Sequence, residues 1–374
     1  MVETSPNERS AEHEQLAVSV RAFLAKTSPE AEVRRLMASE AGFDAEVWRL
    51  MADQLGLQGL IVPVEFGGSG FSHAELGVVL EEMGAALYCG PFYATVALAT
   101  NALLTSGDQA AMARHLPGIA RGDVLATIAM PDGWPETCEP HSLVATRVGD
   151  RWQLDGVARF VLDGALADLI LVVARSGPGL TLFSVQNDAP GLSRTAMRTL
   201  DPTRRLAVLD FASTPAMIVG TENDGARILE RTVDLALVAM AAEQVGATGR
   251  CLDIAVDYAC TRHQFGRPIG SFQAIKHMCA DMLVEFDTAR AIARAAAMSA
   301  ASMSLDLPIL AALAKWRCSD ALIHVSEQTI SVLGGIGVTW EHSAHLYYRR
   351  AMSAALLFGG STQYRSRLAR AVLD

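Results

Sequence analysis

The residues whose types and spacing could do chemistry gather in one segment, Arg262–His277. The segment follows a long apolar helical stretch, and a second helix restarts at its end. It therefore offers fixed guanidinium groups (Arg262 and Arg267), backbone N–H groups and a helix N-terminus to an anion. Phe265 and Phe272 add flat apolar surfaces. The pattern predicts a site for a diphosphate joined to a ring system, and the alternative is an ordinary solvated loop between two helices.

Other chemical motifs are weak or absent from the sequence. Gly67–Gly70 and Gly334–Gly337 are glycine clusters, but neither stands between a strand and a helix of a dinucleotide-binding unit, so turns are the simpler interpretation. The sequence has no HExxH or GxSxG motif, and His342 and His345 are a weak basis for a metal site. The six cysteines form no CxxC pair, which fits small buried residues in a reducing compartment. We expect neither a metal site nor a disulfide.

Three regions of different pattern follow one another along the chain and must position these residues. Residues 1–122 carry helical signals: Asp44 has the type and position of an N-cap, and Ser72–Glu75 has capping-box spacing. In residues 123–224 the pattern changes to β-strands. The expected strands are Val124–Met130, two runs on either side of Gly149-Asp150, Asp168–Ala174, Leu180–Val185 and Leu206–Phe211. Because no helical crossovers separate these runs, we expect an antiparallel sheet.

Long helices return in residues 225–374. Ala226–Tyr258 is nearly apolar all round, as expected of a helix buried between others. A stripe at helical spacing from Ile275 to Ala289 predicts a second helix, and Pro308 opens a third that the glycines at 334 and 335 end. The sequence therefore predicts an α+β fold that is mostly α, with domains at 1–122, 123–224 and 225–374.

Composition limits the classes of function. The 374 residues are 51% hydrophobic and 19% charged, with a formal net charge of −10. Neither a basic block nor interleaved aromatics point to nucleic acid. No run reaches the ~18 apolar residues of a membrane span, and the candidate near Leu235–Ala242 is short. The polar, acidic beginning of the sequence does not resemble a signal peptide, so we expect a cytoplasmic protein.

The segment that opens at Arg262 reads Arg-x-Gln-Phe-Gly-x-Pro-Ile-x-x-Phe-Gln-Ala-Ile-x-His, which is similar to a signature of the acyl-CoA dehydrogenase family. Three further stretches resemble family motifs, so that the likeness covers nearly the whole chain: Pro63–Gly70, Glu81–Gly84 and Leu333–Glu341. The resemblance implies an α-helical domain, a β-barrel-like middle domain and a four-helix bundle. It also implies FAD, an acyl-CoA substrate dehydrogenated between Cα and Cβ, and a flavoprotein electron acceptor.

The resemblance fails at the catalytic base. In this family a carboxylate removes the α-proton of the thioester. The matching position here is Gly359, in Phe358–Thr362. The family's alternative base position falls at Ala236, and the arginine that commonly follows it is Leu237. Both familiar carboxylates are therefore replaced by small apolar residues.

The flavin-facing stretches of the middle domain depart from the family pattern as well. Met130–Gly133 lacks the hydroxyl of the corresponding family motif, and Leu162 stands where the family has Thr or Ser. Ser331 replaces a glutamine expected three residues before Gly334. The family's other cofactor contacts are retained at Arg262, Gln264, Phe265, Phe272, Gly334 and Gly335.

In the family that the chain resembles, the flavin lies at a subunit interface, and the neighbouring chain contributes the Arg-x-Gln-Phe-Gly and Gly-Gly loops to its ADP half. The retained residues match that second role. The hypothesis is a non-catalytic half of an α2β2 complex that binds FAD jointly with a homologous subunit. This arrangement resembles the heteromeric acyl-CoA dehydrogenases with which actinobacteria act on steroid side-chain thioesters.

Two alternatives stay open. In the first, the chain is a self-sufficient homo-oligomeric enzyme with a relocated base. Glu243 lies two helical turns beyond Ala236 and could share its face, whereas Glu341 and Asp132 are weaker candidates. Against this, Glu243 could simply be ion-paired within the bundle, and Glu341 could pair near the arginines at 349 and 350. In the second alternative, the chain is a non-enzymatic CoA-ester-binding or scaffolding protein.

Overall fold

The computed structural model describes residues 10–131 and 143–373, whose elements form two compact units. The helical unit takes residues up to Arg35, His73–Tyr88 and residues from Leu237 onward. The β unit takes Leu36–Ser72 and Cys89–Ala236. Segments from both ends of the chain thus join in the helical unit, and the three sequence domains with boundaries at 122 and 224 stay a prediction.

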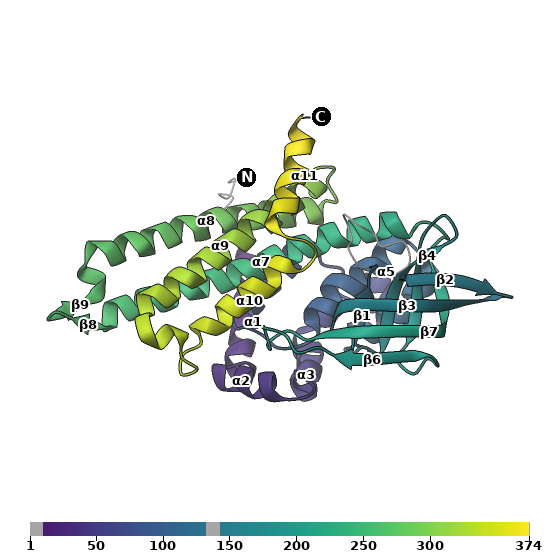
Figure 1. The fold of residues 1–374 in the computed structure, drawn as a ribbon, viewed down its shortest axis with the longest axis horizontal. Helices are drawn as coiled ribbons and strands as arrows, with labels where there is room; N and C mark the ends of the chain where they lie inside the picture. The colour runs from purple at the N-terminus through teal and green to yellow at the C-terminus, as the bar shows by residue number, and fades with distance from the viewer. Residues whose placement is uncertain (1–9, 132–142, 374) are drawn as a thin grey trace. The chain divides into compact units, whose positions relative to one another are not determined.

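Long helices make up the helical unit, and Figure 1 shows α8, α9 and α10 running alongside one another. Its elements, including the two helices that continue into the β unit (α2 and α7), are α1 (Ala11–Thr27), α2 (Glu30–Ala38), α4 (His73–Ala85), α7 (Gly225–Thr261), β8 (His263–Gln264), β9 (Arg267–Pro268), η4 (Ile269–Ser271), α8 (Gln273–Ala301), α9 (Leu307–Leu333), η5 (Gly334–Val338), α10 (Ala344–Leu356) and α11 (Ser361–Leu373). The helices expected from residues 226, 275 and 308 onward are all confirmed. Pro308 lies in the first turn of α9, and Gly334, with φ 66°, ends it.

Helices α4 and α7 cross with their backbones in contact. A methyl group at Gly84 of α4 would lie 1.9 Å from the carbonyl oxygen of Glu243. A methyl group at Gly246 of α7 would lie 1.7 Å from the carbonyl oxygen of Glu81. Each glycine therefore faces the backbone of the other helix, and any side chain at either position would push the two helices apart.

The β unit combines short helices with a sheet of seven strands. Its helices are α3 (Ala45–Leu55), η1 (Leu57–Gly59), η2 (Val64–Phe66), the π-helix η3 (Tyr93–Thr100), α5 (Asn101–Ser106) and α6 (Gln109–Ala120). Its strands are β1 (Ala126–Ala129), β2 (Leu143–Val148), β3 (Arg151–Leu162), β4 (Leu169–Ser176), β5 (Gly179–Gln186), β6 (Leu192–Ala196) and β7 (Leu206–Val219). The N-cap prediction is confirmed, since the Asp44 carboxylate accepts the N–H groups of Glu46 and Val47.

The sheet closes on itself, because strands β4, β2, β3, β7 and β5 pair in sequence and β5 pairs back to β4. This confirms the barrel-like architecture. The expected antiparallel pairing is confirmed for β2–β3, β3–β7, β4–β5, β5–β7 and β6–β7. It does not hold throughout, because β1 pairs with β4 in parallel, and Val144 of β2 pairs with Arg175 of β4 in the same sense. The β2–β3 hairpin supplies the connection that a parallel pair needs, in place of a helix. Strand β6 was not predicted.

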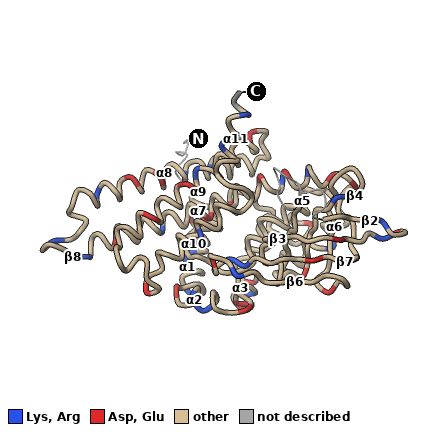
Figure 2. Tube along the Cα trace, viewed as in Figure 1, with Lys and Arg blue, Asp and Glu red and all other residues tan. Residues whose placement is uncertain are grey.

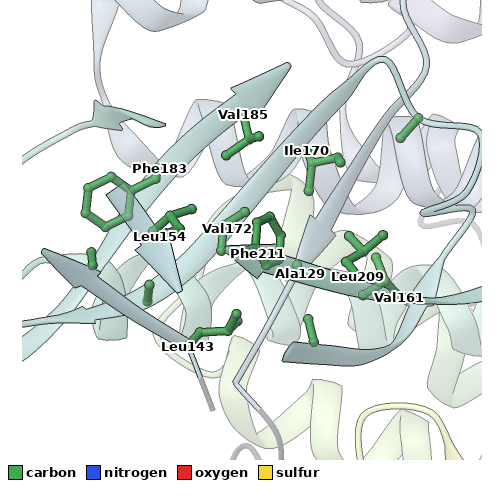
Figure 3. Close-up of a cluster of buried hydrophobic side chains, with 14 of the residues drawn as sticks. Ala129, Leu143, Leu154, Val161, Ile170, Val172, Phe183, Val185, Leu209 and Phe211 are labelled. Atoms are coloured by element: carbon green, nitrogen blue, oxygen red, sulfur yellow. The ribbon is translucent and has the colours of Figure 1, made fainter. Parts of the chain in front are cut away.

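Apolar side chains fill the interior of the barrel (Figure 3). Phe183 and Phe211 are the largest members, and the ring of Trp152 packs against Phe183 with 5.4 Å between ring centres. Strand β4 is buried along most of its length, which explains its continuous apolar run. This core holds strand β3, whose irregular end carries Phe160.

One stretch of the described residues, Leu307–Val338, is long and apolar enough to cross a membrane by length and composition, with a mean hydropathy of 1.2. It comprises α9 and η5, and α9 packs against α8, α10 and α11. Lys315, Arg317 and Asp320 lie within it, and the Lys315 ammonium donates to the carbonyl of Ala354 at 2.5 Å. These contacts are those of a helix in the middle of a bundle.

Replacing Gly246 by Ala is expected to lower the free energy of unfolding by about 2–3 kcal/mol, because the methyl group collides with the Glu81 carbonyl and outweighs the better helix propensity of Ala. The matched control is Gly335→Ala, since a methyl group there meets open space. Urea unfolding of both variants measures the difference. A Gly246→Ala protein as stable as the parent would contradict the close crossing.

Candidate functional site

The segment between α7 and α8 is a small, pre-formed hairpin. His263 pairs with Pro268 and Gln264 with Arg267, which leaves Phe265 and Gly266 as a two-residue turn. Both turn residues have positive φ, 53° and 78°, as a type I′ turn requires. Glycine adopts this conformation freely, but phenylalanine does so at a cost of about 1–2 kcal/mol. The hairpin therefore holds the Phe265 ring outward, where 91% of the residue is exposed.

The hairpin side chains are stacked on one another. The guanidinium carbon of Arg267 lies 4.1 Å from the centre of the Phe272 ring. Phe265 meets the same ring edge-on, with 6.1 Å between centres and 83° between planes. Contacts of these two kinds contribute about 0.5–1 kcal/mol each at exposed sites. They give the tip a defined shape, and Figure 2 shows basic residues at this end of the helical unit.

Arg262 stands at the base of the hairpin with its backbone fixed and its side chain exposed. Its N–H donates to the Tyr258 carbonyl, and its own carbonyl accepts the N–H of Ile269, both at 2.8 Å. Gln264, on β8, is also exposed. Two guanidinium groups, an amide and two phenyl rings are thus available on one short segment, a donor set that fits a diphosphate attached to a flat ring system.

The predicted glycines at 334 and 335 lie exposed where α9 ends, and nothing lies within 4 Å of a methyl group added to either. The end of α9, after which they follow, lies at the same end of the helical unit as the β8–β9 hairpin (Figure 1). Their open surroundings would allow a ligand or another chain to approach the backbone closely. Trp340, just beyond η5, is exposed, and the guanidinium carbon of Arg349 lies 5.2 Å from the centre of its ring.

The position of the expected base, Gly359, lies in a tight turn before α11. Its φ is 104°, and a methyl group there would lie 2.2 Å from the side-chain oxygen of Gln363. That oxygen accepts the N–H of Gly360 at 2.8 Å, and the Tyr364 hydroxyl donates to the carbonyl of Phe358. The turn is therefore built around a glycine, and a glutamate would be strained in it.

The alternative base position also offers no side chain that could remove a proton. Ala236 is fully buried in α7, and its carbonyl accepts the hydroxyl of Tyr93 at 2.6 Å. The Arg204 guanidinium lies over the Tyr93 ring at 5.3 Å. Asp132, a weaker candidate, falls outside the described residues, whereas Glu341 is exposed.

Glu243, the relocated-base candidate, forms an ion pair with Arg350 of α10 inside the helical unit. The two residues are only 5% and 4% exposed, and Arg350 also donates to the carbonyl of Tyr88 at 3.3 Å. An ion pair within the bundle is the role that we considered for Glu243 as the alternative to a catalytic base. A carboxylate held by a buried guanidinium is stabilised in its charged form, which weakens it as a base.

One exposed aromatic residue of the β unit, Phe160, was not singled out from the sequence. It lies where the pairing of β3 with β7 is irregular, between Ala158 and Val161, has φ 59° and is 60% exposed. Leu162, two residues on, is buried, and its carbonyl accepts the Thr127 hydroxyl at 2.5 Å. Like Phe265, Phe160 is an aromatic ring held outward by left-handed backbone.

Two protein-family models match most of the chain. The model for the acyl-CoA dehydrogenase N-terminal domain matches residues 10–123, and that for the C-terminal domain matches residues 223–373. The acyl-CoA dehydrogenase IpdE2 of Mycolicibacterium smegmatis is 37% identical over 360 residues, which are 96% of this chain and 98% of that protein.

Two solved structures that resemble the chain each carry the names of two proteins. One is a variant of the Tcur3481-Tcur3483 steroid ACAD, with a TM-score of 0.87 and 29% identity over 97% of this chain and 98% of the other. The second is the ChsE4-ChsE5 complex of Mycobacterium tuberculosis, with a TM-score of 0.89 and 27% identity over 98% and 99%.

Replacing Arg350 by Met is expected to lower the free energy of unfolding by about 3–5 kcal/mol, because the Glu243 carboxylate stays buried without its cation. The double variant Glu243→Gln, Arg350→Met should lose markedly less, since no charge is then left unpaired. Urea unfolding of the two single variants and the double variant completes the cycle. Arg349→Met is the matched control, with an expected loss of about 1 kcal/mol or less. Equal losses for the two arginines would contradict the assignment.

Proposed function

Because the chain belongs to the acyl-CoA dehydrogenase family, we propose that it is one subunit of an FAD-dependent acyl-CoA dehydrogenase, the half that lacks the catalytic carboxylate. The complex would be an α2β2 assembly with a homologous chain. The observation that carries the proposal is a contrast within the helical unit. The Arg262–Phe272 hairpin is fully built and exposed, whereas the turn at Gly359 is shaped around the absence of a side chain.

The hairpin would hold the ADP half of FAD. Arg262 and Gln264 offer donors to the diphosphate and its neighbouring oxygens, and Phe265 and Phe272 offer apolar faces. Gly334 and Gly335 would let the backbone of η5 come close to the ligand. FAD, when bound, would supply the acceptor for the hydride that leaves Cβ of the acyl thioester.

The partner would supply the base that takes the α-proton. In this chain the role of Gly359 and its braced turn is structural, since Gln363 and Tyr364 occupy its surroundings by bonding the turn's own backbone. The two-protein names of the similar complexes support a heteromer. The name of one of them, a steroid ACAD, supports a bulky polycyclic thioester as the substrate class. Reoxidation would fall to a flavoprotein electron acceptor.

Expressed alone, the chain is expected to carry little FAD, and co-expression with its homologous subunit should give FAD and dehydrogenation activity. In the complex, Arg262→Ala or Phe265→Ala should weaken FAD retention by about tenfold or more, because each removes a charged or stacking contact. Arg147→Ala, at an exposed arginine of the β unit, is the matched control. Absorbance spectra with native mass spectrometry measure FAD per chain. Stoichiometric FAD and turnover from the lone chain would overturn the proposal.

A relocated base at Glu243 makes a different prediction. With Glu243 as the base, Glu243→Gln should cost about 10²–10⁴-fold in turnover. We expect instead that the Glu243→Gln complex keeps its turnover at a temperature where it is folded, and that only its stability falls. Rates measured with a dye acceptor, alongside thermal unfolding, separate the two. A purely scaffolding chain would give neither FAD nor turnover with any homologous partner.

A further inference from the structure

Helix α8, which runs along one side of the helical unit (Figure 1), carries an uncharged line of residues on its outer face. This line, the outer seam, consists of five residues at alternating spacings of four and three: Val284, Thr288, Ala291, Ala295 and Met298. Val284 is 64% exposed and Met298 is 59% exposed. The Thr288 hydroxyl donates to the Val284 carbonyl at 2.7 Å, so its polar group is satisfied within the helix. A helix face that points to water normally carries charged residues, whereas a repeat of 3.5 residues is typical of a face that packs on another helix.

The neighbouring helices of the same unit contact other sides of α8. A methyl group at Gly249 of α7 would lie 2.9 Å from the Phe286 ring. The Cys318 thiol of α9 donates to the Ala289 carbonyl at 3.5 Å, and α4 packs on α8 as well. Among the described residues, the outer seam therefore stays uncovered, although it has the pattern of a helix–helix contact.

Charged residues border the outer seam on one edge. Asp287 and Arg294 lie seven residues apart, which places them on the same edge of the helix. The Asp287 carboxylate accepts from Arg290 at 2.7 Å, and the Arg294 guanidinium lies 4.0 Å from Glu81. This edge thus holds two acidic and two basic groups. Although the chain has a net charge of −10, the edge is balanced and would not repel another copy of itself.

The two bordering charges are arranged in a self-complementary way. Ala291 follows Asp287 by four residues and precedes Arg294 by three. When two α8 helices pair antiparallel across a two-fold axis near Ala291, the same edges of both helices come together. Asp287 of each copy then faces Arg294 of the other, so that acid meets base twice. The small side chains of Ala291 and Ala295 allow the two helix axes to approach to about 8 Å.

The turn from α8 to α9 adds apolar surface at one end of the outer seam. Leu305 is 96% exposed and Met303 is 48% exposed. In an antiparallel pair, each of these turns lies beside the first half of the other copy's α8, where Ala280 and Val284 are exposed. Burial of these side chains would favour the pair, and it extends the contact beyond the two helices.

We propose that the outer seam is the contact between two copies of this chain, paired antiparallel about Ala291. The proposal rests on the α2β2 assembly proposed above and assigns the contact that joins its two halves. The reciprocal match of Asp287 with Arg294 favours a second copy over the homologous chain as the occupant. A two-fold contact of this kind uses the same surface on both copies and closes at two, so it gives a dimer and not a filament.

The first test is cross-linking of Ala291→Cys, in the chain alone and in the co-expressed complex, with a short bifunctional maleimide. The link between two copies at position 291 should form about a hundredfold faster than by random collision, because the paired thiols have a millimolar effective concentration. Mass spectrometry of the linked peptides identifies the two chains. Ala22→Cys, at an exposed alanine of α1, is the matched control. The parent protein gives the background from native cysteines such as the exposed Cys260.

The second test is Val284→Asp. Each copy would then place a carboxylate in the contact, so the dissociation constant of the pair should rise by about a hundredfold or more. Thermal unfolding of the chain should stay unchanged, since Val284 is exposed within it. Val18→Asp, at an exposed valine of α1, is the matched control and should leave the pair intact. Native mass spectrometry measures the number of chains.

In the complex, Val284→Asp should divide the four chains into halves of one chain of each kind that keep their FAD. Arg262→Ala should lose FAD and keep four chains, so failure of the FAD assignment and failure of this contact are distinguishable. A cross-link from position 291 to the homologous chain, or no link at 291 in either preparation, would overturn the proposal. An assembly that Val284→Asp leaves intact would also overturn it.

Discussion

The helical unit depends on the contact between two glycines and two carbonyl groups where α4 crosses α7. This contact sets the spacing of two helices that lie far apart in the sequence. Glu243 joins three helices at this point. Its carbonyl faces Gly84 of α4, and its carboxylate binds Arg350 of α10. The crossing therefore positions α7, whose far end leads into the β8–β9 hairpin, and the pair of Glu243 with Arg350 ties it to α10, the helix before the Gly359 turn.

Local signals in the sequence predicted the elements of the fold well. Asp44 caps α3, Pro308 begins α9 and Gly334 ends it, because each acts through its own backbone or its immediate neighbours. The parallel pairing of β1 with β4 could not be read in the same way. Strand direction in a closed sheet depends on which distant strands complete the ring, and a pattern of alternating residues carries no information about that choice.

The same difference between local signals and contacts of distant residues applies to the candidate site. The spacing from Arg262 to Phe272 predicted a loop that offers cations and rings, and the hairpin has that form. Its internal stacking of Arg267 on Phe272, and the left-handed backbone of Phe265, are properties of the folded turn. The partner of Glu243 lies 107 residues away, so no local pattern pointed to Arg350. In the β unit, Phe160 was hidden because a bulge, which the sequence does not mark, turns its side chain outward.

The buried pair of Glu243 and Arg350 also constrains how this sequence can change over time. A lineage that lost either residue first would pass through a protein with an unpaired buried charge, so the two substitutions must arise together or through a compensated intermediate. Among descendants of a common ancestor, both residues should be present or both replaced, and chains that carry only one should hold another charge in the same place. The presence of the pair would then serve as a marker of this lineage, independent of the β8–β9 hairpin.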